Sequence, residues 1–229
     1  MLKNAAKHEK GTMHTRGAYT KEKGGDTMLI EVPYLADRAV EYALRWALSR
    51  NPLFPDFAGI GGDCTNFISQ CLLAGGATMN PTRDFGWYYY TPENRAPAWS
   101  GVEFFYDFIT GAEVFRRENG GSGPYAAEIT FADGLRVGDV VQLADSAGDF
   151  YHTLIITGFE GDIPLVCAHN DDARNRSLAT YRFASARFLR PLGTRLQADT
   201  SDAYADLLSG INYRPPVLES TRILLGMPG

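Results

Sequence analysis

Cys64 has the sequence context of a reactive thiol, because it stands at the start of a predicted helix. The stretch from Asp63 to Cys71 reads DCTNFISQC. Asp63 is a favourable N-cap residue, and an apolar stripe with helical spacing follows it. This stripe comprises Cys64, Phe67, Ile68, Cys71 and Leu72. The unpaired amides and the dipole of a helix N-terminus stabilise a thiolate, which is the nucleophilic form of cysteine. Cys64 is therefore a candidate nucleophile, and Cys71, two turns further along, is predicted to fill the core.

A nucleophilic cysteine needs a base with an orienting partner, and a predicted β-hairpin supplies both. His152 lies in the strand-like run 151–157, and His169 follows the run 163–168. If Glu160-Gly161 is a two-residue turn between these runs, His152 stands opposite His169. A three-residue loop instead places Asn170 opposite His152. Either register gives His152 a polar partner.

The same residues also allow a weaker alternative, which is a metal site. Cys167, His169 and His152 are all metal-ligating residue types, but the spacing lacks the usual four-ligand pattern. We therefore expect no metal and no other cofactor, with Cys167 in the core. The chain has three cysteines, so at least one thiol stays outside any intrachain disulfide.

The order of predicted elements indicates an α+β fold. Apolar residues at helical spacing predict a first helix that ends at Asn51-Pro52, with Val40, Ala43, Leu44, Ala47 and Leu48 on its inner face. A second helix spans 63–74 and stops at Gly75-Gly76, and a short third one covers 102–109. Runs at 140–143, 151–157, 163–168 and 181–183 then predict an antiparallel meander.

Composition limits the organisation and the class of the protein. The 229 residues are 45% hydrophobic with a net charge of −5. No apolar run approaches membrane-span length, and the acidic balance disfavours nucleic-acid binding. We expect a flexible leader over 1–28, one domain over 29–192, and a C-terminal tail over 193–229 with a short helix at 201–208. No signal peptide is recognised, so the default expectation is a cytoplasmic protein.

An aromatic cluster lies between the predicted helices and the predicted sheet. It comprises Trp87, Tyr88, Tyr89, Tyr90 and Trp99. Such residues either fill a core or line a substrate cleft, and the sequence favours neither. In the cleft interpretation, Trp87, Tyr88 and Trp99 contact the substrate.

The combination resembles the papain-like cysteine hydrolases, and more closely the family known as the Putative amidase domain, a relative of CHAP and bacterial cell-wall cysteine peptidases. The specific segment is GDCTNFISQC. The other resembling segments are YLADRAVEYALRWALSRN (34–51), FGWYYY (85–90), AWS (98–100), GDVV (138–141), HTLIIT (152–157) and AHND (168–171). The resemblance implies a papain-like fold in which helices, with the nucleophile at a helix N-terminus, pack on an antiparallel sheet.

The resemblance also implies roles for single residues. Cys64 becomes the nucleophile, His152 the general base, and His169 the residue that orients the imidazole, with Asn170 as an alternative third member. Cys64 and His152 are then expected to form a thiolate–imidazolium pair. The backbone amide of Cys64 is a candidate oxyanion donor, and the side chain of Asn51 a further one. Asp63 is expected to cap the helix rather than to take part in catalysis.

Three functions remain open at this point. The first is a cysteine amidase or peptidase that acts on a peptide or amide substrate, with bacterial cell-wall peptides as the family-based expectation. The second is acyl transfer to an amine by the same intermediate. The third is a catalytically silent binding or structural module that uses the same fold.

Overall fold

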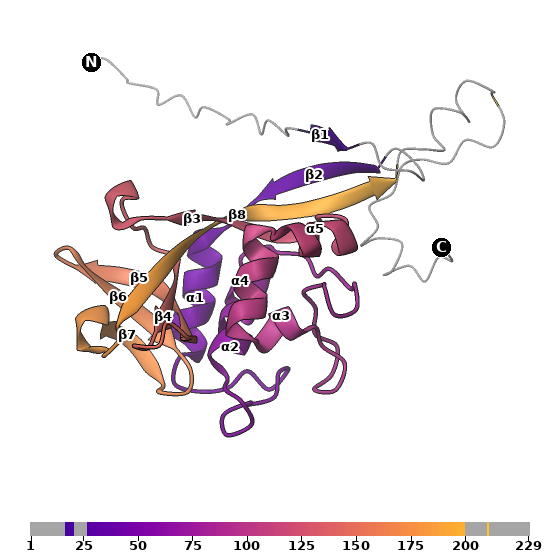
Figure 1. The fold of residues 1–229 in the computed structure, drawn as a ribbon. Coiled ribbons are helices and arrows are strands. Elements are labelled where there is room, and N and C mark those ends of the chain that lie inside the picture. The colour runs from indigo at the N-terminus through magenta and orange to yellow at the C-terminus, as the bar shows by residue number, and fades with distance from the viewer. Residues whose placement is uncertain (1–16, 21–26, 200–209, 211–229) are drawn as a thin grey trace, which may run out of the picture.

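The computed structural model describes residues 17–20, 27–199 and 210 and shows an α+β arrangement of helices beside a curled antiparallel sheet (Figure 1). The sheet has the strand order β1-β2-β8-β4-β5-β6-β7, and β3 also pairs with β8. The predicted fold class is confirmed at this level. None of the helices in the described part of the chain has the length and apolar character of a membrane span.

Five α-helices and eight strands make up the described ranges. The helices are α1 (Ala36–Trp46), α2 (Cys64–Ala74), α3 (Pro97–Ser100), α4 (Val102–Thr110) and α5 (Glu113–Asn119). The strands are β1 (Gly17–Thr20), β2 (Thr27–Pro33), β3 (Gly123–Ile129), β4 (Val140–Ala144), β5 (Phe150–Glu160), β6 (Ile163–Ala168), β7 (Ala173–Ser177) and β8 (Ser185–Asp199).

Strand β5 is buried on both faces of the sheet. Its side chains therefore point alternately toward the helices and toward a second apolar cluster. Ile155 belongs to the core cluster that contains the buried faces of α1, α2 and α4. Leu154 and Ile156 belong to a second cluster on the opposite face of the sheet. Because side chains alternate along a strand, Thr153 faces the helices and His152 faces the second cluster.

Helix α2 forms as its sequence predicts. It begins at Cys64, every residue from Cys64 to Leu72 is buried, and Gly75 follows its last residue. Helix α4 and strands β4 and β6 also match their predicted ranges closely. Helix α1 ends earlier than predicted, at Trp46. Leu48, predicted to face inward, is 62% exposed because the chain leaves the helix at Ala47 and turns toward Asn51-Pro52.

Five strands were not predicted from the sequence, namely β1, β2, β3, β7 and β8. Strands β3, β7 and β8 contain glycine, proline or many polar residues and lack a clear apolar alternation. The long strand β8 forms because it pairs with β2, β3 and β4, and not because of its own pattern. At Gly193 an added Cβ would lie 2.2 Å from the carbonyl oxygen of Val32, so this close pairing needs glycine. The predicted strand at 181–183 is wrong, since these residues form a non-strand connection after a 3₁₀ turn.

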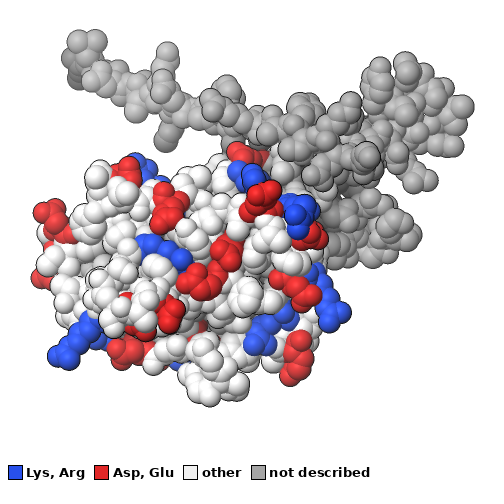
Figure 2. All heavy atoms as spheres, in the orientation of Figure 1, with Lys and Arg blue, Asp and Glu red and all other residues white. Residues whose placement is uncertain are grey.

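The sheet extends beyond both ends of the domain that was expected at 29–192. Strands β1 and β2 overlap the expected leader, and β8 continues beyond residue 192 to pair with β2 up to Thr27↔Asp199. The domain limits themselves stay a prediction, and the helix predicted at 201–208 lies outside the described residues. Acidic and basic side chains intermix over the described face shown in Figure 2.

Candidate active site

Cys64 lies in the first turn of α2, with its thiol turned toward strand β5. Its side chain is only 3% exposed. The sulfur lies 3.8 Å from the hydroxyl of Thr65 and receives hydrogen bonding from the backbone of Thr153. The hydroxyls of Thr65 and Thr153 are themselves 2.9 Å apart. This contact joins the residues that directly follow Cys64 and His152, so it fixes the helix start against this part of β5.

The surroundings of Cys64 disfavour its ionised form in the free protein. Burial raises the pKa of the Cys64 thiol, and the negative charge of Asp63 adds to this effect. Hydrogen bonds from Thr153 and Thr65 favour the thiolate and partly offset the burial. The thiol is therefore protonated at neutral pH.

The other two cysteines are buried in the core. Cys71 and Cys167 are free and fully buried, which confirms the predicted core position of Cys71. Burial raises the pKa of Cys71 well above its usual value. Cys167 lies 3.7 Å from the hydroxyl of Thr157. Within the described ranges, no group of three or more His, Cys, Asp or Glu side chains has the arrangement of a metal site.

The hairpin that carries His152 turns one residue later than predicted. Glu160 pairs with Ile163, so Gly161-Asp162 is the turn. An irregularity at Thr157 then shifts the register to Ile155↔Cys167. Extended past the end of β6, this register places Asn170, and not His169, opposite His152. The predicted turn at Glu160-Gly161 is therefore wrong. The observed register favours Asn170, which was the alternative partner of His152.

His152 forms part of the wall of an open pocket of about 460 Å³. Its ring is 7% exposed and lies 6.0 Å, centroid to centroid, from the ring of Tyr181. The remaining lining residues are Tyr151, Asn170, Asp171, Arg176, Thr180 and Arg182. In the described part of the chain, the His152 ring has no hydrogen-bond partner, so it is available to a molecule that enters the pocket. The Tyr181 hydroxyl is buried, and Arg176 lies over the Tyr181 ring.

Cys64 and His152 are both uncharged at neutral pH. Burial lowers the pKa of His152 to about 4, with the opposing charges of Asp171 and Arg176 as smaller effects. In the described residues no hydrogen bond joins the Cys64 sulfur to the His152 ring. The structure thus differs from the expected thiolate–imidazolium pair, because burial penalises both charges.

The low pKa of His152 predicts a specific loss of stability in acid. Between pH 6.5 and about 4 the unfolded chain binds a proton at His152 that the folded chain does not bind. The free energy of unfolding therefore falls as the pH decreases, by about 3 kcal/mol at pH 4 from this residue. Urea denaturation across this range, compared between the wild type and His152→Gln, measures the effect. Identical pH dependence of the two proteins would contradict it.

Asp63 is a fully buried carboxylate that organises the loop before α2. Its Oδ1 atom accepts hydrogen bonds from the backbone amide of Phe57 (3.1 Å) and the side-chain amide of Asn66 (2.7 Å). Its Oδ2 atom lies 3.2 Å from Nε of Arg50. Asp63 occupies the N-cap position, but its side chain caps no backbone amide of α2. The expected capping role is thus replaced by a role in this buried network.

His169 does not orient His152, which corrects the role that the resemblance implied. Its Nδ1 atom lies 2.6 Å from Oδ2 of Asp63, and its Nε2 atom lies 3.0 Å from the backbone oxygen of Trp46. The ring also stacks on Phe67 with 3.9 Å between centroids. Both nitrogens are therefore occupied on the α2 side of the sheet. Only the folded chain shows this pairing, since the two side chains are 106 residues apart.

The two asparagines have different surroundings. Asn170 shares the pocket with His152, and its Oδ1 atom accepts a 2.6 Å hydrogen bond from the backbone amide of Asp63. It thus connects the pocket to the residue before Cys64. The amide of Asn51 donates to the hydroxyl of Tyr42 (2.9 Å) and accepts from the backbone of Leu53 (3.0 Å). These contacts favour a structural role for Asn51, and its oxyanion role stays a prediction.

The aromatic cluster is mainly core. Trp87 and Trp99 are 0% exposed and Tyr88 is also buried, so the cleft interpretation of these three side chains is wrong. The indole of Trp87 donates to Ser69 (3.0 Å), and that of Trp99 donates to Asn66 (2.8 Å). These hydrogen bonds satisfy the N–H group of each indole, and burial leaves no surface of either ring for a substrate.

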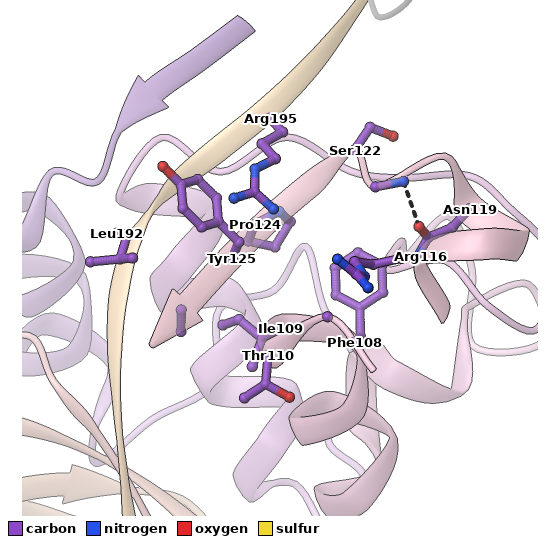
Figure 3. Close-up of a pocket in the computed structure, with 13 residues that line it drawn as sticks. Phe108, Ile109, Thr110, Arg116, Asn119, Ser122, Pro124, Tyr125, Leu192 and Arg195 are labelled. Carbon is purple, nitrogen blue, oxygen red and sulfur yellow. Dashed lines mark hydrogen bonds between the residues drawn. The ribbon is translucent and has the colours of Figure 1, made fainter. Parts of the chain in front are cut away.

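A second pocket, of about 280 Å³, lies between α4, α5, β3 and β8 (Figure 3). Arg116, Tyr125 and Arg195 contribute to its wall, and the guanidinium of Arg195 lies 3.9 Å above the Tyr125 ring. None of the residues predicted for the active site lines it. Of the candidate residues, His152 and Asn170 line the pocket of about 460 Å³, whereas Cys64 lines neither pocket.

Comparison with known proteins identifies the family. Residues 33–189, which include α2, β5 and β6, match the family described as "Putative amidase domain". The chain belongs to this family. Within the amidase domain lie Cys64, His152 and Asn170, together with the Asp63–His169 pair. Membership supports amide hydrolysis at the level of the family.

A curated relative matches part of this chain. The chain is 36% identical over 144 residues to the uncharacterized protein YhbB of Bacillus subtilis (strain 168). The match covers 60% of this chain and 42% of the relative, so the chain spans less than half the length of that protein. No solved structure matches the chain.

Proposed function

We propose that the protein is a cysteine-dependent hydrolase of peptide or amide bonds, with Cys64 as nucleophile and His152 as general base. The observation that carries the proposal is the placement of Cys64. A free thiol in the first turn of α2 is held against the backbone of β5 at Thr153, directly after His152. Family membership and the open pocket beside His152 support the same chemistry.

The neutral resting state defines the order of the chemical steps. His152 takes the thiol proton as the sulfur attacks the carbonyl carbon, so the C–S bond forms while the carbonyl π electrons move to oxygen. Collapse of this intermediate breaks the C–N bond, and the imidazolium gives its proton to the leaving amine. Water, deprotonated by His152, then attacks the thioester carbon, the C–S bond breaks, and the imidazolium returns the proton to the sulfur of Cys64. Backbone amides at the start of α2 stabilise the oxyanion, and Asn170 is the candidate third residue.

The substrate is proposed to be a peptide, and bacterial cell-wall peptides are the first class to test. The pocket beside His152 carries both tyrosine rings and charged side chains, including Tyr181, Asp171 and Arg176. Such walls suit a chain that combines apolar and charged groups. Acyl transfer to an amine uses the same thioester and differs only in the final nucleophile.

A binding module without catalysis is the second candidate. It is favoured by the raised pKa of the Cys64 thiol and the lowered pKa of His152, because this protein holds no preformed thiolate. In the hydrolase, a substrate that displaces water from the pocket has to promote transfer of the Cys64 thiol proton to His152. A binding module needs no such proton transfer.

Intact-protein and peptide mass spectrometry after brief incubation with peptide amides separates the two candidates. Peptidoglycan stem peptides form one arm, and unrelated peptide amides form the other. We expect an acyl adduct on Cys64 and none on Cys71 or Cys167, which serve as internal controls of the same residue type. Saturable peptide binding without any adduct or product would instead establish the binding module.

A further inference from the structure

His169 lies between two hydrogen-bond acceptors. Its Nδ1 atom is 2.6 Å from the carboxylate of Asp63, and its Nε2 atom is 3.0 Å from the backbone oxygen of Trp46. A backbone carbonyl and an ionised carboxylate can only accept, while a neutral imidazole has a single N–H group. The two contacts together therefore need one proton more than a carboxylate and a neutral imidazole hold.

The surroundings of Asp63 place this additional proton on the ring. Oδ1 of Asp63 already accepts two N–H groups, from Phe57 and Asn66, and Arg50 lies 3.2 Å from Oδ2. Donors and a cation around a carboxylate favour its ionised form. The pair is thus an ion pair, and it is buried, with Asp63 0% and His169 1% exposed.

We infer that His169 is an imidazolium in the folded protein and acts as a positioning residue for Cys64. One N–H group holds the carbonyl at the end of α1, and the other holds the residue that immediately precedes Cys64. The charge state depends on this geometry alone. The positioning role also rests on the proposed function, because it requires that Cys64 be the nucleophile.

The neighbouring charges explain why a cation is required here. Besides Asp63, the carboxylates of Asp56 and Asp172 face Arg50, at 3.2 Å from Nε and 2.9 Å from the terminal nitrogens respectively. Three carboxylates thus surround two cations, Arg50 and His169. If His169 is neutral, nearby cations balance the negative charge of Asp63 less completely. That negative charge disfavours the Cys64 thiolate. The imidazolium therefore also limits the electrostatic cost of forming the thiolate.

Nitrogen NMR of the ring atoms tests the charge state in the full-length protein. In ¹⁵N-histidine-labelled protein at pH 7, we expect protons on both ring nitrogens of His169 and on only one of His152. His152 is the internal control, since burial lowers its pKa to about 4. The spectrum of His169→Gln identifies the signals, and single variants at the other three histidines do so by elimination if that variant fails to fold. A single ring proton on His169 at pH 7 would overturn the inference.

The variant Asp63→Asn tests the positioning role. We expect its His169 to lose the second ring proton and its turnover to fall by about 100-fold, because small displacements of a reacting group have effects of this size. We also expect a changed pH profile of iodoacetamide labelling at Cys64. If the ring loses its proton but labelling and turnover do not change, His169 is not a positioning residue. If wild-type Cys64 forms no adduct, the proposed function fails while the ring-proton result stands independently.

Discussion

Cys64→Ala is expected to reduce peptide or amide hydrolysis to the background rate, a loss on the order of 10⁴-fold or more. The sulfur supplies the bond to the acyl group, and alanine offers no atom to replace it. The site is compact around this atom, with Thr65 and the backbone of Thr153 as its neighbours. Removal of one buried sulfur should leave helix α2 folded, because its remaining buried face and its end at Gly75 do not change. Steady-state turnover of the peptide that acylates the wild type measures the loss.

Cys71→Ala is the matched control for this prediction. It makes the same substitution on the same helix, two turns further along and fully inside the core. We expect it to reduce stability slightly and to retain activity and the Cys64 adduct. The nucleophile assignment would be wrong if Cys64→Ala kept substantial turnover, or if both variants lost activity to the same extent while both remained folded.

His152→Ala is expected to lower turnover by about 10²- to 10⁴-fold, which is the usual contribution of a general base. The effect should be large because the Cys64 thiol is protonated at neutral pH and needs a proton acceptor. The fold should tolerate the change, since the ring has no hydrogen-bond partner to leave unsatisfied in the described residues. Turnover measured between pH 5 and 9 gives the size and the pH dependence of the loss.

Imidazole added to His152→Ala provides the control. The open pocket that His152 lines has room for a free imidazole molecule, so we expect partial recovery that saturates with imidazole concentration. The same additive should leave Cys64→Ala inactive. Full activity of His152→Ala without imidazole would remove His152 from the mechanism and would direct attention to another base.

Several features of the site follow from local sequence alone. Helix α2 and its reactive position are predictable because a helix has a fixed period, and an apolar stripe of that period ends in a glycine stop. Strands β4, β5 and β6 are predictable for the same reason, since each is a short run of apolar and β-branched residues. The candidates Cys64 and His152 were therefore identifiable from residue type and from the elements that carry them.

Other features depend on contacts between distant residues. The irregularity at Thr157 shifts the β5–β6 register by one position, and no local pattern signals it. The sequence is equally consistent with a core position and a cleft position for Trp87 and Trp99. Only three-dimensional packing decides which aromatic residues become buried. Strand β8 has a weak pattern of its own and exists through its partners β2, β3 and β4.

The two histidines show the difference most clearly. Residue order and local pattern predict that each histidine follows or begins a strand, that both are polar residues near the end of a hairpin, and that Cys64 begins a helix. The folded chain adds that His169 binds Asp63 and Trp46 while His152 faces an open pocket. This information is not local, because a hydrogen bond depends on where two atoms meet in space. Local periodicity specifies which face a side chain takes, but not which distant residue lies opposite that face.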